Sequence, residues 1–426
     1  MGIQSAMFSG VSGLNTNSQA MSVIGNNLAN TNTLGFKGAR YVFSDLLSST
    51  ISGSGGSSQV GRGVGLSTID NIFSQGTFES TSSDTDVAIE GDGFFIVKEV
   101  GNDTSFYTRA GAFRFDEEGY LVNPEGFRVQ GKQYDPITGE LAGGDPSDIQ
   151  VQNTGLVEAN PTANMTFTTN LDANSIELGG DANDIDPADT TTFNYSASSQ
   201  VFDSLGEPHL ITVFWRLEDT LLNTWSSAYT VDGDLLNPTT LPPAFAFDPD
   251  GRLPDTDGDG EPNPVIKNIA IADWGNGSAQ NQAIDLTFDM TQYDSDSVVI
   301  GQDQDGYGAG NLTNVAINED GVVVASYSNG TQENIAALVL GKFKNPNGLE
   351  MAGSNLFTAN ANSGNPRVGL PGPELGNLFT NSLEQSNVDM GQEFVKMITA
   401  QRGFQANSKI ISTVDEMLGE LINLKR

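Results

Sequence analysis

The chain has 426 residues, a formal net charge of −35 and no cysteine. This length allows two to four domains, each with its own core, and the lack of cysteine excludes disulfides, thiolate metal sites and cysteine nucleophiles. The acidic excess disfavours nucleic-acid binding, because phosphates are bound by basic surfaces. Apolar runs such as residues 336–340 are too short to cross a bilayer, so we expect no membrane insertion.

An apolar stripe with alternating spacings of four and three residues runs through residues 3–28. Its positions are Ile3, Met7, Gly10, Leu14, Asn17, Met21, Ile24 and Leu28. The spacing predicts a helix with one narrow apolar seam, which needs a partner helix to bury it. We expect the helix to end within residues 26–32, because asparagine and threonine favour turns and caps.

Two segments have the composition of linkers. Residues 48–65 are mostly serine and glycine, which bury little surface and have high chain entropy. Residues 359–377 hold Pro366, Pro371 and Pro373 together with glycines. We therefore expect linker segments at residues 33–72 and 359–384.

The body between these segments predicts short strands joined by tight turns. Residues 113–122 contain two short apolar runs around a four-residue acidic turn that ends in Gly119, and residues 315–324 repeat the pattern around Gly321. This likeness predicts one split β domain at 73–150 plus 302–358. Residues 151–301, with strands expected at 211–215 and 284–288, then form an inserted outer β domain.

The only histidine is His209. A zinc site there would need unusual help from carboxylates, so a histidine in a turn or at a strand edge is the simpler interpretation. The sequence has no nucleophile elbow, phosphate-binding loop or paired-histidine zinc motif. We therefore predict no catalytic residue and no cofactor.

The acidic loop at residues 255–260 is a weak candidate for a metal site. Asp255, Asp257 and Asp259 precede Gly260 with the spacing of a calcium-binding loop. The twelfth position, however, holds Ile266 where such a loop needs a bidentate glutamate, and two prolines prevent a following helix. An acidic surface loop is the simpler interpretation.

A second 4-3 stripe runs through the proline-free segment 388–424. Its positions are Met390, Phe394, Met397, Gln401, Phe404, Ser408, Ile411, Asp415, Leu418 and Ile422. Two such helices at opposite ends of a chain can pair and leave the middle looped out. The predicted fold class is therefore mainly β, with paired N- and C-terminal α-helices forming a coiled-coil-like stalk and with discontinuous β domains. Residues 1–32 plus 385–426 form the expected helical polymerisation domain.

Both ends also carry motifs that resemble the flagellar rod and hook axial proteins, and among them the hook proteins. The matching segments are residues 9–14 (SGVSGL), 26–37 (NNLANTNTLGFK), 384–390 (EQSNVDM) and 400–409 (AQRGFQANSK). Residues 91–97 (GDGFFIV) are shared by rod and hook types, and residues 201–206 (VFDSLG) with the large insertion resemble the hook type.

This resemblance implies a structural subunit and not an enzyme. It implies an extracellular homopolymer, a short curved tube of the bacterial flagellum that transmits torque from rod to filament. The implied partners are other copies of the chain, the distal rod protein, the hook cap protein, the hook–filament junction protein and the flagellar type III export apparatus.

The two stripes supply the expected self-assembly residues. These are Met7, Leu14, Met21, Ile24, Leu28, Phe394, Met397, Phe404, Ile411 and Leu418. The alternatives are a distal rod protein, a hook–filament junction protein or, from another class, a calcium-binding surface β protein. The last would leave the terminal stripes unexplained.

Overall fold

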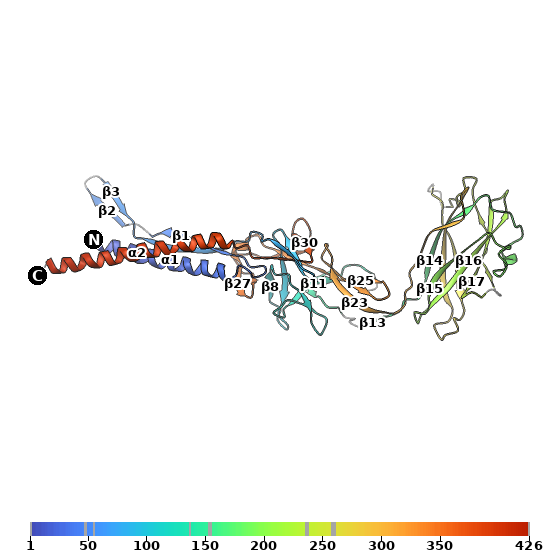
Figure 1. The fold of residues 1–426 in the computed structure, drawn as a ribbon, viewed down its shortest axis with the longest axis horizontal. Coiled ribbons are helices and arrows are strands. Elements are labelled where there is room, and N and C mark those ends of the chain that lie inside the picture. The colour runs from blue at the N-terminus through green and yellow to red at the C-terminus, as the bar shows by residue number, and fades with distance from the viewer. Residues whose placement is uncertain are drawn as a thin grey trace. The chain divides into compact units, whose positions relative to one another are not determined.

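A computed structural model describes residues 2–46, 49–53, 56–135, 138–151, 156–234, 238–256 and 261–424 (Figure 1). The chain divides into two compact units, each with its own core. Unit 1 comprises Met1–Gln152, Asn314–Ala325 and Glu333–Arg426, and unit 2 comprises Asn153–Thr313 and Ser326–Gln332. The predicted fold class is confirmed: the chain is mainly β, with one long helix near each end.

The helices are α1 (Gly2–Ala29) and α2 (Met390–Leu424), and they pack side by side (Figure 1). Asp389 caps the start of α2, because its carboxylate accepts a hydrogen bond from the Gln392 amide at 3.0 Å. Helix α1 ends at Ala29, within the expected range of 26–32, and the Asn30 amide still donates a hydrogen bond to Asn26 O at this end. Among the described residues, no helix is long and apolar enough to cross a membrane.

The segments expected as linkers contain regular strands. Strands β1 (Ala39–Asp45) and β4 (Val64–Asn71) form an antiparallel pair, and β2 (Ser49–Gly53) pairs with β3 (Gly56–Val60). In the second segment, β30 (Asn377–Thr380) pairs with β6 (Val87–Glu90), and β31 (Ser382–Glu384) pairs with β5 (Phe78–Ser80). Composition did not predict these strands because their partners supply the backbone hydrogen bonds.

The main sheet, most of which lies in unit 1, has the order β23-β24-β25-β11-β7-β8-β28-β27, with the short strands β9, β10, β12, β26 and β29 off this path. Its strands are β7 (Phe94–Lys98), β8 (Ser105–Thr108), β9 (Arg114–Phe115), β10 (Leu121–Val122), β11 (Arg128–Gln133), β12 (Ser147–Asp148), β23 (Gly310–Ile317), β24 (Val322–Tyr327), β25 (Gln332–Leu338), β26 (Leu340–Lys342), β27 (Glu350–Gly353), β28 (Leu356–Thr358) and β29 (Arg367–Gly369). Buried side chains including Phe95, Leu121 and Leu338 form its core.

The two hairpins predicted from their matching turns both lie in unit 1. In the first turn the Asp116 amide donates to Tyr120 O and the Gly119 amide donates to Asp116 O; in the second, Asn318 and Gly321 make the equivalent bonds. Gly119 and Gly321 have φ angles of 81° and 78°. Glycine is needed there because other residues rarely adopt that conformation.

Unit 2 is a sandwich of two sheets. One has the order β20-β21-β14-β22, and the other has the order β15-β16-β17-β18 with β19 beside β17. The strands are β14 (Asn164–Asp172), β15 (Tyr195–Phe202), β16 (Pro208–Asp219), β17 (Thr224–Val231), β18 (Thr239–Thr240), β19 (Phe245–Ala246), β20 (Val265–Ile271), β21 (Gln282–Tyr293) and β22 (Val298–Gln304). Strand β13 (Leu156–Val157) lies outside the sandwich and pairs with β23. Trp215 and Phe288, which lie in strands expected from the sequence, are fully buried in the core.

Candidate assembly interface

The two helices approach closely where each presents a glycine to an asparagine of the other. A Cβ atom on Gly13 would lie 2.7 Å from the Asn407 side-chain amide, and one on Gly403 would lie 2.8 Å from Asn17 Oδ1. Each asparagine also donates to the carbonyl four residues earlier, Asn17 to Gly13 O at 2.6 Å and Asn407 to Gly403 O at 2.9 Å. The contact is therefore reciprocal.

Sequence reasoning missed this contact, although it left a signal. Both helices contain Gly-x-x-x-Asn, at 13–17 and at 403–407. Asn17 appeared only as a polar exception in an apolar stripe. Its position is explained by the glycine opposite it, since an asparagine that satisfies its own helix can pack where no side chain intrudes.

The expected self-assembly residues fall into three groups by packing and exposure. Ile24 is buried, and Met21, Leu28 and Met397 pack around it with Ala20 and Ala400. Leu14, Phe404 and Ile411 are half-buried. Met7, Phe394 and Leu418 are exposed. Part of the predicted seam thus holds the two helices together, and part of it is left uncovered in this single chain.

A shallow groove of about 300 Å³ lies between the start of α1 and the C-terminal half of α2. Its apolar lining consists of Met7, Ile411, Val414 and Leu418, and three of these four belong to the expected seam. The groove therefore brings together stripe residues from both ends of the chain.

The uncovered apolar surface is wider than the predicted stripes. Further side chains on the helices are 44–63% exposed: Phe8, Val11, Val395, Ile398, Ile410 and Met417. Most are sequence neighbours of stripe positions, so that α2 contains apolar pairs such as 394–395, 397–398, 410–411 and 417–418. These apolar pairs indicate a wider apolar face, which a single 4-3 series does not include.

A buried ion cluster joins the segments that flank the two helices. Glu384 Oε1 lies 2.6 Å from Lys37 Nζ, and Glu384 Oε2 lies 3.4 Å from Arg109 Nη1, with all three side chains at most 1% exposed. The Gly76 amide also donates to Glu384 Oε1 at 2.8 Å. Burial lowers the pKa of Lys37, and the negative charge of Glu384 partly opposes that effect.

Asparagines extend this connection. Asn387 Oδ1 accepts from the Gly38 amide at 2.8 Å, and its Nδ2 donates to Ile72 O at 2.7 Å. Asn27 brackets Ala39, donating to its carbonyl and accepting from its amide. The motifs at 26–37 and 384–390 are thus places where the two ends of the chain are bonded to each other, which sequence spacing alone did not predict.

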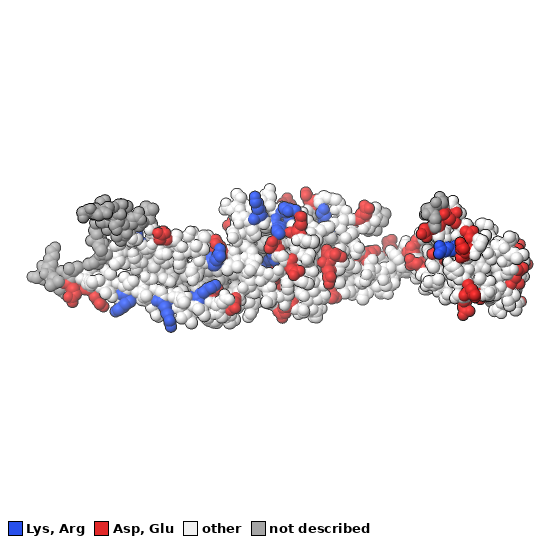
Figure 2. Space-filling model, turned by 90° about the horizontal axis from the view of Figure 1, so that it is seen from above, with Lys and Arg blue, Asp and Glu red and all other residues white. Residues whose placement is uncertain are grey.

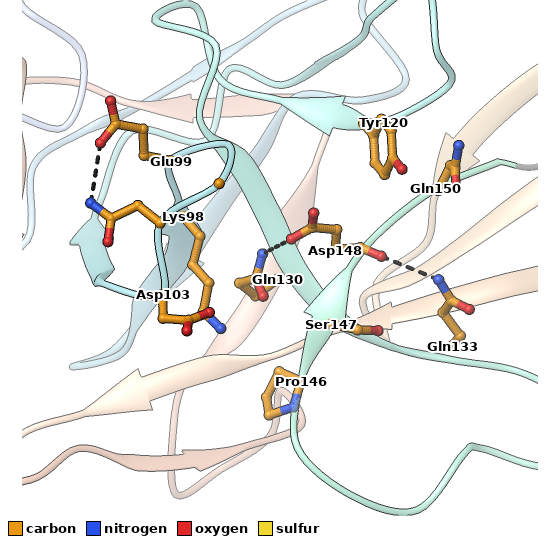
Figure 3. A pocket seen from close by; sticks show the side chains of 12 residues that line it. Lys98, Glu99, Asp103, Tyr120, Gln130, Gln133, Pro146, Ser147, Asp148 and Gln150 are labelled. Carbon is orange, nitrogen blue, oxygen red and sulfur yellow. Dashed lines mark hydrogen bonds between the residues drawn. The ribbon is translucent and has the colours of Figure 1, made fainter.

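A cavity in unit 1 with a volume of about 570 Å³ is open and polar (Figure 3). Its side chains mainly satisfy one another: Gln130 Nε2 donates to Asp148 Oδ1 at 2.6 Å, and Gln133 Nε2 donates to Asp148 O at 3.2 Å. Asn102 likewise donates to Glu99. The cavity therefore presents bonded surface polar groups instead of a nucleophile next to a base.

The weak calcium candidate cannot be placed as a set. Asp257 and Asp259 lie outside the described residues, and only Asp255 of the three is described.

Four family models match successive parts of the chain. They are the flagella basal body rod protein at residues 7–37, the flagellar hook protein FlgE/F/G D1 domain at 88–159, the flagellar basal body protein FlaE D2 domain at 170–307, and the flagellar basal body rod FlgEFG protein C-terminal at 380–424. Together with the paired terminal helices, these matches define a flagellar rod and hook axial protein.

Full-length relatives narrow this class. The chain is 37% identical to the flagellar hook protein FlgE of Borreliella burgdorferi and 33% identical to that of Treponema pallidum, covering 99% of each chain in both comparisons. It is 33% identical to that of Salmonella typhimurium, over 97% of this chain and 98% of the relative. The chain belongs to the flagellar hook protein family.

A solved structure shares the fold. The crystal structure of Helicobacter pylori flagellar hook protein FlgE2 aligns with a TM-score of 0.51 at 16% identity, covering 73% of this chain and 99% of that one. The family places the protein in the extracellular bacterial flagellum, and its relatives are structural proteins. The resemblance stated from the terminal motifs is confirmed.

Proposed function

We propose that this chain is a non-enzymatic subunit that polymerises through its terminal helices into the short, curved and flexible tube that transmits torque from rod to filament. The observation that carries the proposal is the uncovered apolar surface of the helix pair, including Phe8, Val395 and Ile422 at 62–67% exposure. Exposed apolar surface of this extent marks a protein–protein interface. Other copies of the chain supply the missing cover.

The self-assembly residues proposed from the sequence have two roles in this scheme. Met21, Ile24, Leu28 and Met397 hold the helix pair together, which is supported by their shared core. Met7, Phe394 and Leu418 contact neighbouring copies, which is supported by their exposure. Leu14, Phe404 and Ile411 lie between these extremes and serve both contacts.

We also propose an order of layers in the tube and a set of partners for it. Residues 1–32 and 385–426 would line the inside of the tube, the split β domain (73–150 and 302–358) would form a middle layer, and the inserted domain (151–301) would form the outermost one. The segments 33–72 and 359–384 would connect the layers. The tube would join the distal rod protein to the hook–filament junction protein, grow beneath the hook cap protein, and receive subunits from the flagellar type III export apparatus.

Electrostatic repulsion should oppose this assembly. Acidic side chains are spread over both units on the face seen in Figure 2, in keeping with the net charge of −35. Copies packed side by side repel one another until salt screens them, and the screening length falls from about 30 Å at 0.01 M salt to about 8 Å at 0.15 M. We expect seeded assembly to speed up as ionic strength rises over this range.

Electron microscopy of seeded assembly tests the proposed function. The wild-type chain should form curved tubes, and Phe404→Asp and Phe394→Asp should abolish them because each puts a charge into the apolar contact. Leu221→Asp is the matched control: Leu221 lies in unit 2 and is 91% exposed, so its tubes should be normal. Circular dichroism would check that all variants are folded. Normal tubes from Phe394→Asp would contradict the interface, and straight tubes from the wild type would indicate a rod protein.

A further inference from the structure

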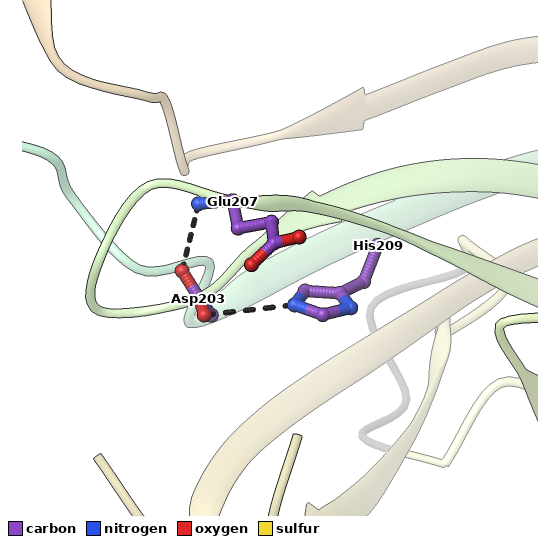
Figure 4. Close-up of side chains that lie close together, drawn as sticks. All are labelled: Asp203, Glu207 and His209. Carbon is purple, nitrogen blue, oxygen red and sulfur yellow. Dashed lines mark hydrogen bonds and ion pairs between the residues drawn. The ribbon is translucent and has the colours of Figure 1, made fainter. Parts of the chain in front are cut away.

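Three potential metal ligands meet at the turn between β15 and β16 in unit 2. The side chains of Asp203, Glu207 and His209 each place one ligand atom within 4.8 Å of the other two (Figure 4). Asp203 and His209 are buried, whereas Glu207 is exposed. The cluster therefore has two fixed members and one member open to solvent.

Asp203 is held as a carboxylate. Its Oδ1 accepts from the amides of Leu205 and Glu207 at 2.9 and 2.8 Å, and its Oδ2 accepts from Asn276 Nδ2 at 2.6 Å. Burial by itself would raise the pKa of this carboxyl, but these hydrogen bonds outweigh it, so that the pKa lies below its usual value. A buried negative charge is thus built into the turn.

His209 is oriented toward that charge. Its Nδ1 lies 2.7 Å from Asp232 Oδ2, and its ring stacks on Trp274 with 4.0 Å between ring centroids. The other ring nitrogen, Nε2, is buried, makes no hydrogen bond within the described part of the chain, and lies 3.5 Å from Asp203 Oδ2. A carboxylate on one imidazole nitrogen with the second nitrogen unbonded is the arrangement of metal-binding histidines, in which the carboxylate fixes the tautomer.

The two carboxylates converge on the same point. Asn276 Nδ2 donates to Asp203 Oδ2 at 2.6 Å and also to Glu207 Oε2 at 2.7 Å. One nitrogen can reach both oxygens only because they face a common space. A cation at that place would take over the role of the amide, with Asn276 moving aside.

We propose that Asp203, Glu207 and His209 bind a divalent transition-metal cation, for which zinc is the probe. One imidazole nitrogen and two carboxylate oxygens suit zinc and its neighbours, whereas calcium and magnesium prefer oxygen ligands alone. The two negative charges balance the cation, and water can complete its coordination from the side of Glu207. The carboxylate help that a zinc site at a lone histidine would need is present in the folded chain.

Binding would tie together the two ends of the β15–β16 turn. Asp203 follows β15 and His209 lies at the start of β16, whereas the displaced Asn276 belongs to the β20–β21 loop, which keeps its 2.7 Å hydrogen bond from Ala279 N to Ser204 Oγ. A cation would make the turn more rigid and raise the thermal stability of unit 2, because it binds the folded state only. The inference does not depend on the proposed assembly.

Zinc titration of the full chain, stripped of metal by a chelator, tests the site. Calorimetry at pH 7.5 should show one zinc ion bound per chain, and Trp274 fluorescence should change in step because that ring stacks on His209. Glu207→Gln and His209→Gln should each weaken zinc binding by about tenfold or more. Asp232→Asn should weaken it by about 10- to 100-fold, as for other carboxylates that orient a metal-bound histidine.

Two controls make the result specific. Glu158→Gln changes an exposed acid of the same unit, and the triple variant Asp255→Asn, Asp257→Asn, Asp259→Asn removes the acidic loop. Both should bind zinc as the wild type does. Binding lost in the triple variant but kept in Glu207→Gln would overturn the proposal, as would calcium binding as tightly as zinc or no saturable zinc binding up to about 1 mM. If His209→Gln fails to fold, Glu207→Gln decides, because Glu207 is exposed.

Discussion

The sandwich of unit 2 and the helix pair of unit 1 differ in how far their large apolar side chains are buried. In the sandwich, Trp215, Trp225 and Phe288 are fully buried between two sheets. On the helices, Phe394, Val395 and Ile398 remain about half exposed or more. The sandwich therefore completes its core within one chain, whereas the helix pair buries only one face and needs further copies to cover the rest.

This difference separates two kinds of substitution. Changes inside the sandwich should lower the stability of the single chain, because its core is already complete. Changes on the outer face of the helices should affect assembly and leave the single chain folded.

Trp215→Ala should lower the free energy of unfolding of the sandwich by about 3–5 kcal/mol, because it removes a large side chain and leaves a cavity. Trp215 packs edge-on against Phe167 and Phe288. Denaturant unfolding of the full chain, followed by the fluorescence of the remaining tryptophans, would measure it. The control Leu221→Ala should change stability by less than about 0.5 kcal/mol. Equal effects would mean that the sandwich core is not where its stability arises.

Glu384→Gln should destabilise unit 1 by about 3 kcal/mol or more, because it leaves Lys37 and Arg109 buried without their carboxylate. Glu374→Gln is the matched control, since that ion pair with Arg367 is exposed on both sides and is worth little. Calorimetric unfolding of both variants would compare them. A wild-type melting profile for Glu384→Gln would show that the cluster does not hold the ends of the chain together.

Gly13→Ala and Gly25→Ala, both in α1, test the close approach of α1 to α2. A Cβ on Gly25 meets nothing within 4 Å, so alanine there should raise stability by about 1 kcal/mol through its helix propensity. At Gly13 the same gain should be cancelled or reversed, because the new methyl displaces the Asn407 side chain. Thermal melting of unit 1 would rank the two. Equal stabilisation by both would argue against the reciprocal contact.

Lys267 gives the sandwich a pH dependence of its own. It is 5% exposed, and burial lowers its pKa from 10.5 to about 8. Between these values the unfolded chain keeps a proton that the folded chain has released, so the free energy of unfolding should rise with pH from about 8 to 10.5. Relative to Lys267→Met, the wild type should gain stability over this window. Parallel melting curves for the two proteins across it would contradict the assignment.

Local spacing was enough to predict the repeating features. The 4-3 stripes predicted both helices, because residues three and four apart share a helix face. The acidic turns ending in Gly119 and Gly321 predicted two similar hairpins, since glycine adopts the required positive φ. The terminal motifs resembled the correct family. For the assembly surface, the stripes located Met7, Phe394 and Leu418 but missed their exposed neighbours, because a single 4-3 series covers only one narrow seam of a helix.

The strands of the expected linkers show where composition is insufficient. Serine and glycine have weak strand preference, yet β2 and β3 pair because each supplies the other with backbone partners. The spacing of the stripes also did not determine which of their side chains are exposed. Ile24 and Met7 both belong to the N-terminal stripe, but only Ile24 has Ala20 and Ala400 beside it in the fold.

The sequence by itself therefore determined the two helices, the β body, the hairpin turns and the family, all of which depend on short-range spacing or on contiguous motifs. Tertiary structure decided which groups meet across long separations. Lys37 and Glu384 are 347 residues apart, and Asp203 and Asn276 are 73 apart. The physical reason is that a charge or an asparagine can bond to any suitable partner, and only the packing of the whole chain selects which one lies within 3 Å.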